Sequence, residues 1–126
     1  VVIDNEAGME HISRQTTPEI GGLFVIGDPT RRGLSAVERI AELTKELGTR
    51  IQRSFLVVNN VVGELPQAFE ERARSVGIPL LGTLPHDPAV TDFDLVGRPF
   101  IELDDTSVIY TQAKKLIKDV LVQTAI

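Results

Sequence analysis

Two residues near the start of the chain have the chemistry of a metal and phosphate site. Asp4 directly follows the apolar run Val1–Ile3, and Gly8 comes four residues later. An aspartate at the end of a strand can hold Mg²⁺ through coordinated water, because Mg²⁺ loses its waters reluctantly. A glycine lets the backbone approach a phosphate closely and donate its N–H. Taken alone, the same residues are also typical of an ordinary strand-to-helix turn.

A third candidate is Asn59, which directly follows the apolar run Phe55–Val58. A side-chain amide offers a donor and an acceptor side by side, and this pair matches N6 and N7 of adenine. An asparagine at the end of a strand can also close it through an Asx-type turn. Both interpretations fit the sequence at this point.

The last candidates are Pro85, His86 and Asp87, which come shortly after the apolar run Ile78–Leu81. Prolines at positions 85 and 88 predict a stiff loop whose backbone could border a base. His86 alone fits an exposed loop histidine better than a catalyst. His11 is similar, because spacing identifies no nucleophile or orienting partner for it.

Four apolar runs must position these residues, and helical patterns separate the later runs. This alternation predicts βαβ units and a parallel sheet. Ligands of such sheets bind outside the carboxyl ends of the strands, so the polar residues should collect at one edge. The second run is continuously apolar, which predicts a strand covered on both faces. The runs are Val1–Ile3, Leu23–Ile26, Phe55–Val58 and Ile78–Leu81.

The clearest helical pattern covers Gly33–Gly48, where Ser35 and Glu38 have the spacing of a capping box. Its predicted buried stripe is Ala36, Ile40, Leu43 and Leu47. A second helix is expected from about Pro66 to Val76, ended by Gly77, with Phe69, Ala73 and Val76 buried. Residues 83–105 are expected to be an irregular loop, helical around residues 90–95. The last helix is expected over residues 106–121, with Asp104 and Asp105 at the positive end of its dipole.

Composition narrows the class of protein. Apolar residues make up 42% and charged residues 25% of the 126 residues, as in an ordinary globular domain. The net charge of −5 argues against nonspecific nucleic-acid binding. The apolar runs are too short to span a membrane, so we expect no membrane partner. The absence of cysteine excludes thiolate metal ligands within the chain and fits a cytoplasmic location.

A phosphate-binding loop of the form G-x-x-x-x-G-K-[ST] is missing, and the chain begins inside an apolar run without methionine. We therefore interpret residues 1–126 as the C-terminal half of a single nucleotide-driven α/β domain. An isolated half should have an incomplete sheet and should hydrolyse no nucleotide by itself.

Several motifs together resemble the ATPases that mature carbon monoxide dehydrogenase by nickel insertion. These enzymes belong to the deviant-Walker class of P-loop NTPases, together with division-site ATPases, chromosome-partitioning ATPases and the nitrogenase iron protein. Residues 4–11, Asp-Asn-Glu-Ala-Gly-Met-Glu-His, resemble the family's switch II segment, as do Arg14 and Thr16-Thr17 after them. The resemblance continues through residues 27–30, 57–59, 82–90 and 97–99 and covers nearly the whole chain.

The resemblance implies a role for each candidate residue. Asp4 would be the Walker B aspartate that acts on Mg²⁺ through water, and Gly8 would sense the γ-phosphate of ATP. Asn59 would border adenine together with residues 85–87, Pro85, His86 and Asp87. Asn60 stands where this class commonly has an arginine that stacks on the base. The implied fold is a partial P-loop NTPase sheet, Rossmann-like and flanked by helices, without the P-loop strand.

The resemblance also implies partners. The intact family members form homodimers that use ATP to help load nickel into a client metalloenzyme, carbon monoxide dehydrogenase. Their Cys-x-Cys pair, which binds nickel or zinc, and their P-loop both lie upstream of the position that matches Val1. Two alternatives stay open: a chromosome-partitioning or division-site ATPase of the same class, and a non-catalytic interaction module that uses residues 4–17.

Overall fold

The computed structural model describes residues 19–46 and 50–124, and three parallel strands form the sheet of this part. The strands are β1 (Glu19–Gly27), β2 (Arg50–Val61) and β3 (Leu80–Pro85), in the order β1-β2-β3. In the register, Leu23 lies opposite Ser54 and Val58 lies opposite Thr83. The predicted α/β class with a parallel sheet is confirmed. The predicted strand at residues 1–4 lies outside the described residues.

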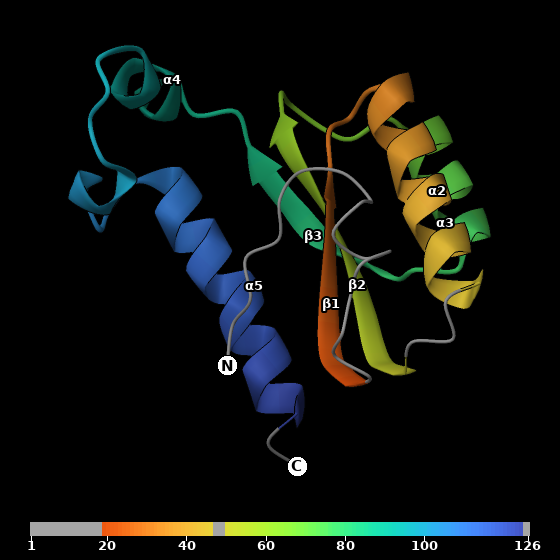
Figure 1. The fold of residues 1–126 in the computed structure, drawn as a ribbon. Helices are drawn as coiled ribbons and strands as arrows, with labels where there is room; N and C mark the ends of the chain where they lie inside the picture. Colours follow the sequence, from red (N-terminus) through yellow and green to blue (C-terminus); the bar gives the residue numbers. More distant parts are fainter. Residues whose placement is uncertain (1–18, 47–49, 125–126) are drawn as a thin grey trace.

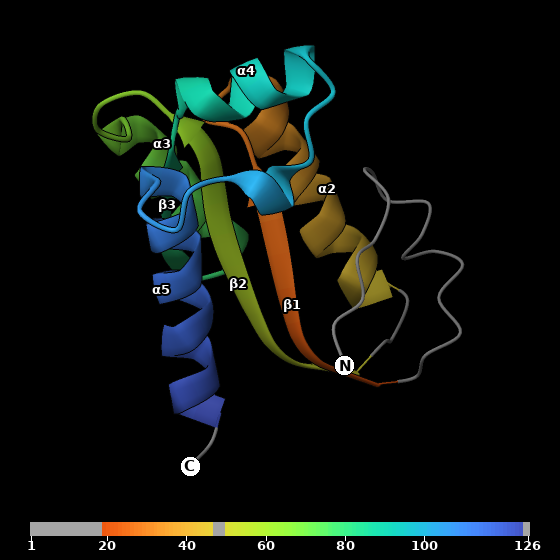
Figure 2. The same cartoon turned by 90° about the vertical axis from the view of Figure 1, so that its left-hand side faces the viewer.

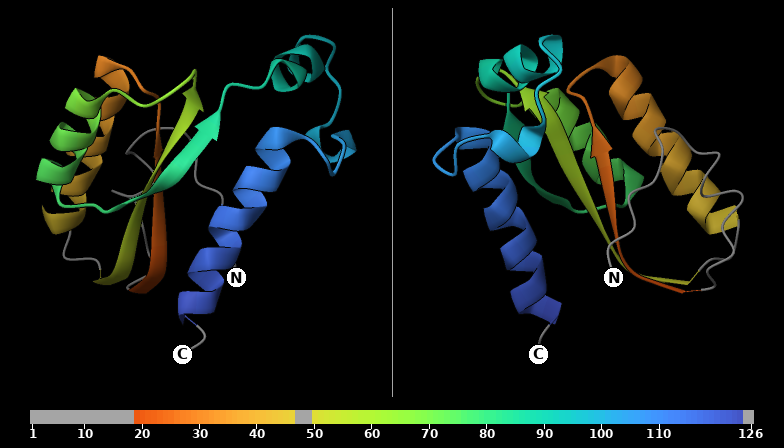
Figure 3. Two further views of the ribbon diagram at one scale, coloured as in Figure 1. Left: turned by 180° about the vertical axis from the view of Figure 1, so that it is seen from behind. Right: turned by 60° about the vertical axis from the view of Figure 1, so that its left-hand side comes forward.

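Helices cover both faces of this sheet (Figure 1). Helices α2 (Arg31–Glu46) and α3 (Gln67–Val76) pack on one face, and α5 (Val108–Thr124) lies on the other side, against β3. The view from behind in Figure 3 shows the two sides clearly. Between β3 and α5 come α4 (Pro88–Leu95) and the 3₁₀ turn η1 (Phe100–Glu102). Figure 2 shows α4 lying over the carboxyl ends of the strands, the edge at which a ligand is expected.

The core lies between the central strand and the α2–α3 layer. Leu56 and Val58 of β2 are completely buried there. Burial of such side chains contributes about 1.5–3 kcal/mol each, which makes β2 the most strongly anchored strand. The other members of this core come from all neighbouring elements: Leu23, Val25, Leu34, Val37, Ala41, Val61, Phe69, Ala73 and Ile78.

Helix α2 begins two residues earlier than predicted, and its cap is Thr30. The Thr30 hydroxyl oxygen accepts a hydrogen bond from the Gly33 N–H at 2.9 Å, so Ser35 lies inside the helix. The predicted Ser35–Glu38 capping box is therefore wrong, and Glu38 instead forms an ion pair with Arg72 of α3 at 2.8 Å. Thr30 and Ser35 both have a hydroxyl that can cap a helix. The earlier start is the one that places Gly33 tightly against the Asp28 backbone, where a Cβ would overlap the Asp28 carbonyl oxygen.

The buried face of α2 also differs from the prediction. Leu34, Val37 and Ala41 are buried, whereas the predicted Ala36 is exposed. Of the other predicted members, Ile40 packs against the core, Leu43 is half-buried and Leu47 lies outside the described residues. Apolar residues occur on two adjacent faces of this helix, and periodicity cannot choose between them. The sheet decides, because Val37 packs against Gly27 of β1. The predicted stripe of α3 is confirmed, with Phe69 and Ala73 buried and Val76 packed against the core.

β1 and β2 are longer than their apolar runs, whereas β3 begins at Leu80, two residues after the start of the predicted run, and continues to Pro85. β1 and β2 extend through polar residues such as Glu19 and Arg50, because backbone pairing does not require apolar side chains. In β1 the exposure alternates: Leu23 and Val25 are buried, whereas Phe24 and Ile26 are exposed. The prediction of a strand covered on both faces is therefore wrong within the part of the chain that the structure describes.

Two glycines control helix ends and packing. Gly77 ends α3 in the left-handed conformation, with φ 89°, and its N–H donates to the Arg74 carbonyl. This is the stop that the sequence predicts. Gly82 of β3 faces α5, and a Cβ on it would lie only 2.6 Å from Cδ2 of Leu116. The absence of a side chain at position 82 therefore lets α5 pack close to the sheet.

Candidate functional site

The carboxyl ends of β2 and β3 bring four of the predicted site residues to one edge. Asn59 lies near the end of β2, and Pro85 ends β3, with His86 and Asp87 directly after it. The two strands are hydrogen-bonded neighbours, so these segments lie side by side. Asp4 and Gly8, the predicted metal and phosphate residues, lie outside the described residues.

An irregularity in the strand pairing shapes this edge. Val58 pairs with Thr83 and Val61 pairs with Pro85. Between these two pairs the chain advances by three residues in β2 but by only two in β3. Such a bulge bends the strand and redirects a side chain, and bulges are common next to functional sites. Asn60 sits in the bulge with φ 60°, the left-handed region that asparagine tolerates better than most residues. No other non-glycine residue of the described ranges has a positive φ.

The redirected Asn60 side chain contacts His86. Its Oδ1 lies 2.6 Å from Nδ1 of the imidazole, and the His86 backbone N–H donates to the Val61 carbonyl at 2.9 Å. A side-chain carbonyl oxygen only accepts, so this geometry suits an imidazole whose Nδ1 carries the proton and donates it. His86 is thereby held by both its backbone and its ring. The sequence did not single out Asn60 for this role, although the Asn-Asn pair at a strand end was a signal.

Asp87 has a structural role that sequence reasoning did not assign. It is the N-cap of α4, and its Oδ1 accepts from the Ala89 N–H at 3.0 Å. Pro88 takes the first helical position, where a missing N–H costs nothing. The same carboxylate therefore orients α4 over the strand ends, directly after the residue that Asn60 holds.

Asn59 stays available for a ligand within the described part of the chain. Its side chain is half-buried and makes no hydrogen bond to residues 19–46 or 50–124. Its neighbour Asn60, by contrast, is exposed and bonded to His86. A half-buried amide without a partner can still donate and accept, as recognition of a base requires.

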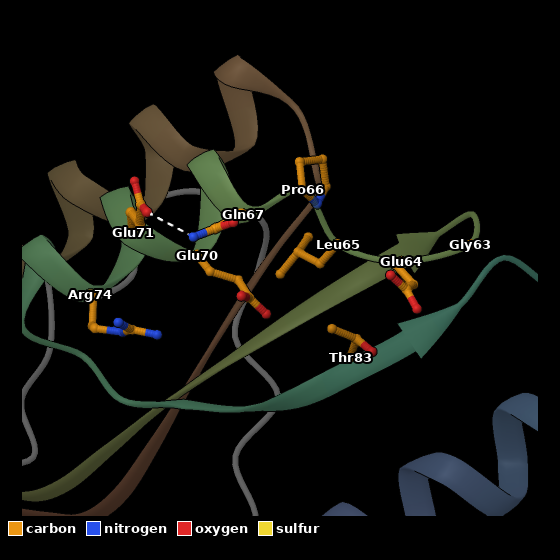
Figure 4. A pocket seen from close by; sticks show the side chains of 9 residues that line it. All are labelled: Gly63, Glu64, Leu65, Pro66, Gln67, Glu70, Glu71, Arg74 and Thr83. Atoms are coloured by element: carbon orange, nitrogen blue, oxygen red, sulfur yellow. Dashed lines mark hydrogen bonds between the residues drawn. The ribbon is translucent and has the colours of Figure 1, made fainter.

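A polar hollow of about 770 Å³ lies beside this edge, between α3 and β3 (Figure 4). Glu70 and Arg74 of α3 point into it, and Thr83 of β3 faces them. Glu71 at its rim accepts a hydrogen bond from Gln67 at 3.1 Å. Ligand pockets are mostly apolar, whereas this hollow is largely polar and carries three glutamates, so it does not suit a nucleobase.

The described residues contain no metal centre. Within residues 19–46 and 50–124, no three His, Asp or Glu side chains group closely enough to hold an ion. The expected Mg²⁺ residue, Asp4, lies outside these ranges. In the same ranges, no helix is both long enough and apolar enough to cross a membrane.

The chain is similar to proteins described as ATP-binding. It is 33% identical, over 121 residues, to an uncharacterized ATP-binding protein of Methanocaldococcus jannaschii, a match that covers 96% of this chain and 48% of that protein. It is 31% identical, over 103 residues, to the carbon monoxide dehydrogenase accessory protein CooC of Rhodospirillum rubrum, which covers 82% and 38% respectively. The chain therefore spans less than half the length of these curated relatives. No protein-family model matches it.

Solved structures show where the fold belongs. A ParA family ATPase from Chlorobium tepidum superposes with a TM-score of 0.66 at 18% identity, covering 83% of this chain and 43% of that one. The MinD cell division protein of Aquifex aeolicus gives a TM-score of 0.63 at 15% identity, covering 79% and 43%. At these identities the likeness shows the fold alone: an α/β sheet shared with P-loop ATPases of the MinD and ParA type.

Proposed function

We propose that the chain is part of an ATP-binding and ATP-hydrolysing protein of the P-loop class, and that the edge formed by β2 and β3 borders its adenine. One observation carries this proposal: Asn59 and residues 85–87 meet at the carboxyl ends of neighbouring parallel strands. This is where ligands of parallel sheets bind. The similarity to an ATP-binding protein over 96% of the chain supports the choice of ligand.

The remaining parts of the site are inferred from residues outside the described ranges. Asp4 would act on Mg²⁺ through water, and Gly8 would donate to the γ-phosphate. Residues 1–126 would be the C-terminal half of one deviant-Walker domain, with the P-loop supplied by sequence upstream. The upstream sequence tests this directly, because a G-K-G-G-x-G-K-[ST] loop should be found there.

Titration calorimetry of the full-length protein with Mg²⁺ and ATP tests the adenine edge. Asn59→Ala should weaken ATP binding about three- to tenfold, because it removes hydrogen bonds worth about 1 kcal/mol. Gln112→Ala removes an amide from the exposed surface of α5 and is the matched control. Unchanged affinity of the Asn59 variant would place the base elsewhere. A wild-type protein that binds no ATP would favour the non-catalytic interaction module.

For the client, we propose a nickel-insertion role in the maturation of carbon monoxide dehydrogenase, acting as a cytoplasmic homodimer. The support is the similarity to CooC and the pair Glu10-His11 with Thr16-Thr17. Nickel or zinc would bind to cysteines outside this chain. Apo carbon monoxide dehydrogenase should gain activity at limiting nickel only when the full-length protein and ATP are both present. ATP hydrolysis without such activation would favour a chromosome-partitioning or division-site ATPase.

A further inference from the structure

At this edge, a hydrogen bond connects the side chains of two residues on neighbouring strand ends. Asn60 and His86 are 26 residues apart, and their side chains meet at 2.6 Å. The contact exists because the bulge turns Asn60 into the left-handed conformation. A backbone bond from the His86 N–H to Val61 holds the same residue a second time.

The bond determines what the ring can offer to a ligand. In a neutral imidazole one nitrogen donates and the other accepts. With the proton on Nδ1 committed to Asn60, Nε2 carries a lone pair and no proton. Nε2 has no partner within residues 19–46 and 50–124, and the His86 side chain is exposed. The ring of His86 therefore offers a hydrogen-bond acceptor at the strand-end edge.

We propose that Asn60 is a positioning residue that holds His86 in the Nδ1–H tautomer, so that Nε2 accepts a hydrogen bond from the exocyclic amino group of a bound base. This inference rests on the proposed function, because it takes a purine nucleotide as the ligand. It goes further by naming the side chain that contacts the amino group of the base and the residue that selects the tautomer of that side chain. A base without an amino group leaves this acceptor unpaired and should bind more weakly.

The tautomer can be measured without any nucleotide. Long-range ¹H–¹⁵N NMR of the full-length protein at pH 8 distinguishes a protonated Nδ1 from a protonated Nε2. We expect the Nδ1–H form in the wild type and in Asn60→Asp, whose carboxylate still accepts. Asn60→Gly adopts the same backbone conformation without strain but loses the acceptor, so it should show a tautomer mixture. If the wild type carries the proton on Nε2, the proposal is overturned. This result would arise if the Asn60 amide were turned so that its NH₂ group donates to Nδ1.

The second measurement compares ATP with purine riboside triphosphate, which lacks the amino group at C6. The wild type should prefer ATP about three- to tenfold, in line with one hydrogen bond of about 1 kcal/mol. His86→Phe and Asn60→Gly should reduce this preference, although Asn59 can still contact the same amino group, and Asn60→Asp should retain it. A preference that His86→Phe leaves at its full size contradicts the assignment. If the wild type binds no ATP, the proposed function and the base selection both fail, while the NMR result still decides whether Asn60 positions His86.

Discussion

At the scale of single residues, Asp104 links pH to the stability of the turn that precedes α5. Its Oδ1 accepts from the Thr106 backbone N–H at 2.9 Å and from the Thr106 hydroxyl at 2.8 Å. The backbone bond and then the hydroxyl bond lower the pKa of Asp104. A carboxyl group whose pKa is lowered by folding stabilises the protein above its unfolded pKa, and this contribution disappears as the pH falls through the folded pKa.

We therefore expect Asp104→Asn to lower the melting temperature slightly at pH 7, with a difference that shrinks below about pH 4. The effect should be small because the carboxylate is exposed to solvent. Thermal melts of both proteins across this pH range are the measurement. Asp105→Asn is the control, since the Asp105 carboxylate has no hydrogen bond within the described residues. If the difference in melting temperature stays the same below about pH 4, the effect of Asp104 does not come from its charge.

Asp4 allows a second prediction at this scale, in the full-length protein. Asp4→Asn should abolish ATP hydrolysis and largely spare ATP binding. The phosphate loop would remain intact, and only the outer shell of the metal would be lost. Phosphate release and calorimetry measure the two effects separately, with Asp119→Asn on α5 as a control for loss of one exposed carboxylate. If the Asp4→Asn variant hydrolyses ATP at the wild-type rate, Asp4 does not act on the metal.

At the scale of elements, the contact between α5 and the sheet depends on Gly82. Gly82→Ala would place a Cβ 2.6 Å from Cδ2 of Leu116, and overpacking of this kind costs about 1–3 kcal/mol. Urea unfolding should show that loss. Gly21→Ala in β1 is a matched control, because a Cβ there meets no atom within 4 Å. Adding Leu116→Ala to Gly82→Ala should recover part of the loss, and failure to recover any would mean that α5 does not pack here.

At the scale of the whole molecule, apolar side chains are exposed on the α5 side of the sheet within the described residues, because α5 packs against β3 and leaves part of this face open. Phe24 and Ile26 of β1 are 38% and 61% exposed, and Ile117 and Leu121 of α5 are also exposed. β1 is an edge strand of the described sheet, and exposed edges pair readily with other chains. In the full-length domain we expect the upstream half to cover this surface.

Residues 1–126 expressed alone should therefore self-associate, hydrolyse no ATP and bind ATP no tighter than about millimolar, or −4 kcal/mol. Light scattering, phosphate release and calorimetry test these three points. Ile26→Lys should reduce the association, whereas Val62→Lys, at an exposed position in the β2–α3 connection, should not. A monodisperse monomer with a cooperative melt would contradict the first point. Micromolar binding or turnover would mean that the phosphate site lies within this chain.

The sequence by itself determined the features that depend on neighbouring residues. The alternation of apolar runs and helical patterns predicted the parallel sheet, because strands joined by helical crossovers pair in parallel. Gly77 predicted the end of α3, because a left-handed stop depends only on local backbone preferences. Strand topology then placed Asn59 and residues 85–87 at one edge. The nucleotide roles of these residues, and those of Asp4 and Gly8, stay predictions.

Only the tertiary structure decided between alternatives that fit the local sequence preferences equally well. Thr30 and Ser35 both fit a helix cap, and the close packing of Gly33 on Asp28 selected Thr30. Two adjacent faces of α2 were apolar, and the sheet selected the one with Val37. The bond between Asn60 and His86 was also beyond sequence reasoning. It depends on a bulge that forms only when β2 pairs with a strand more than twenty residues away, so no local pattern encodes it.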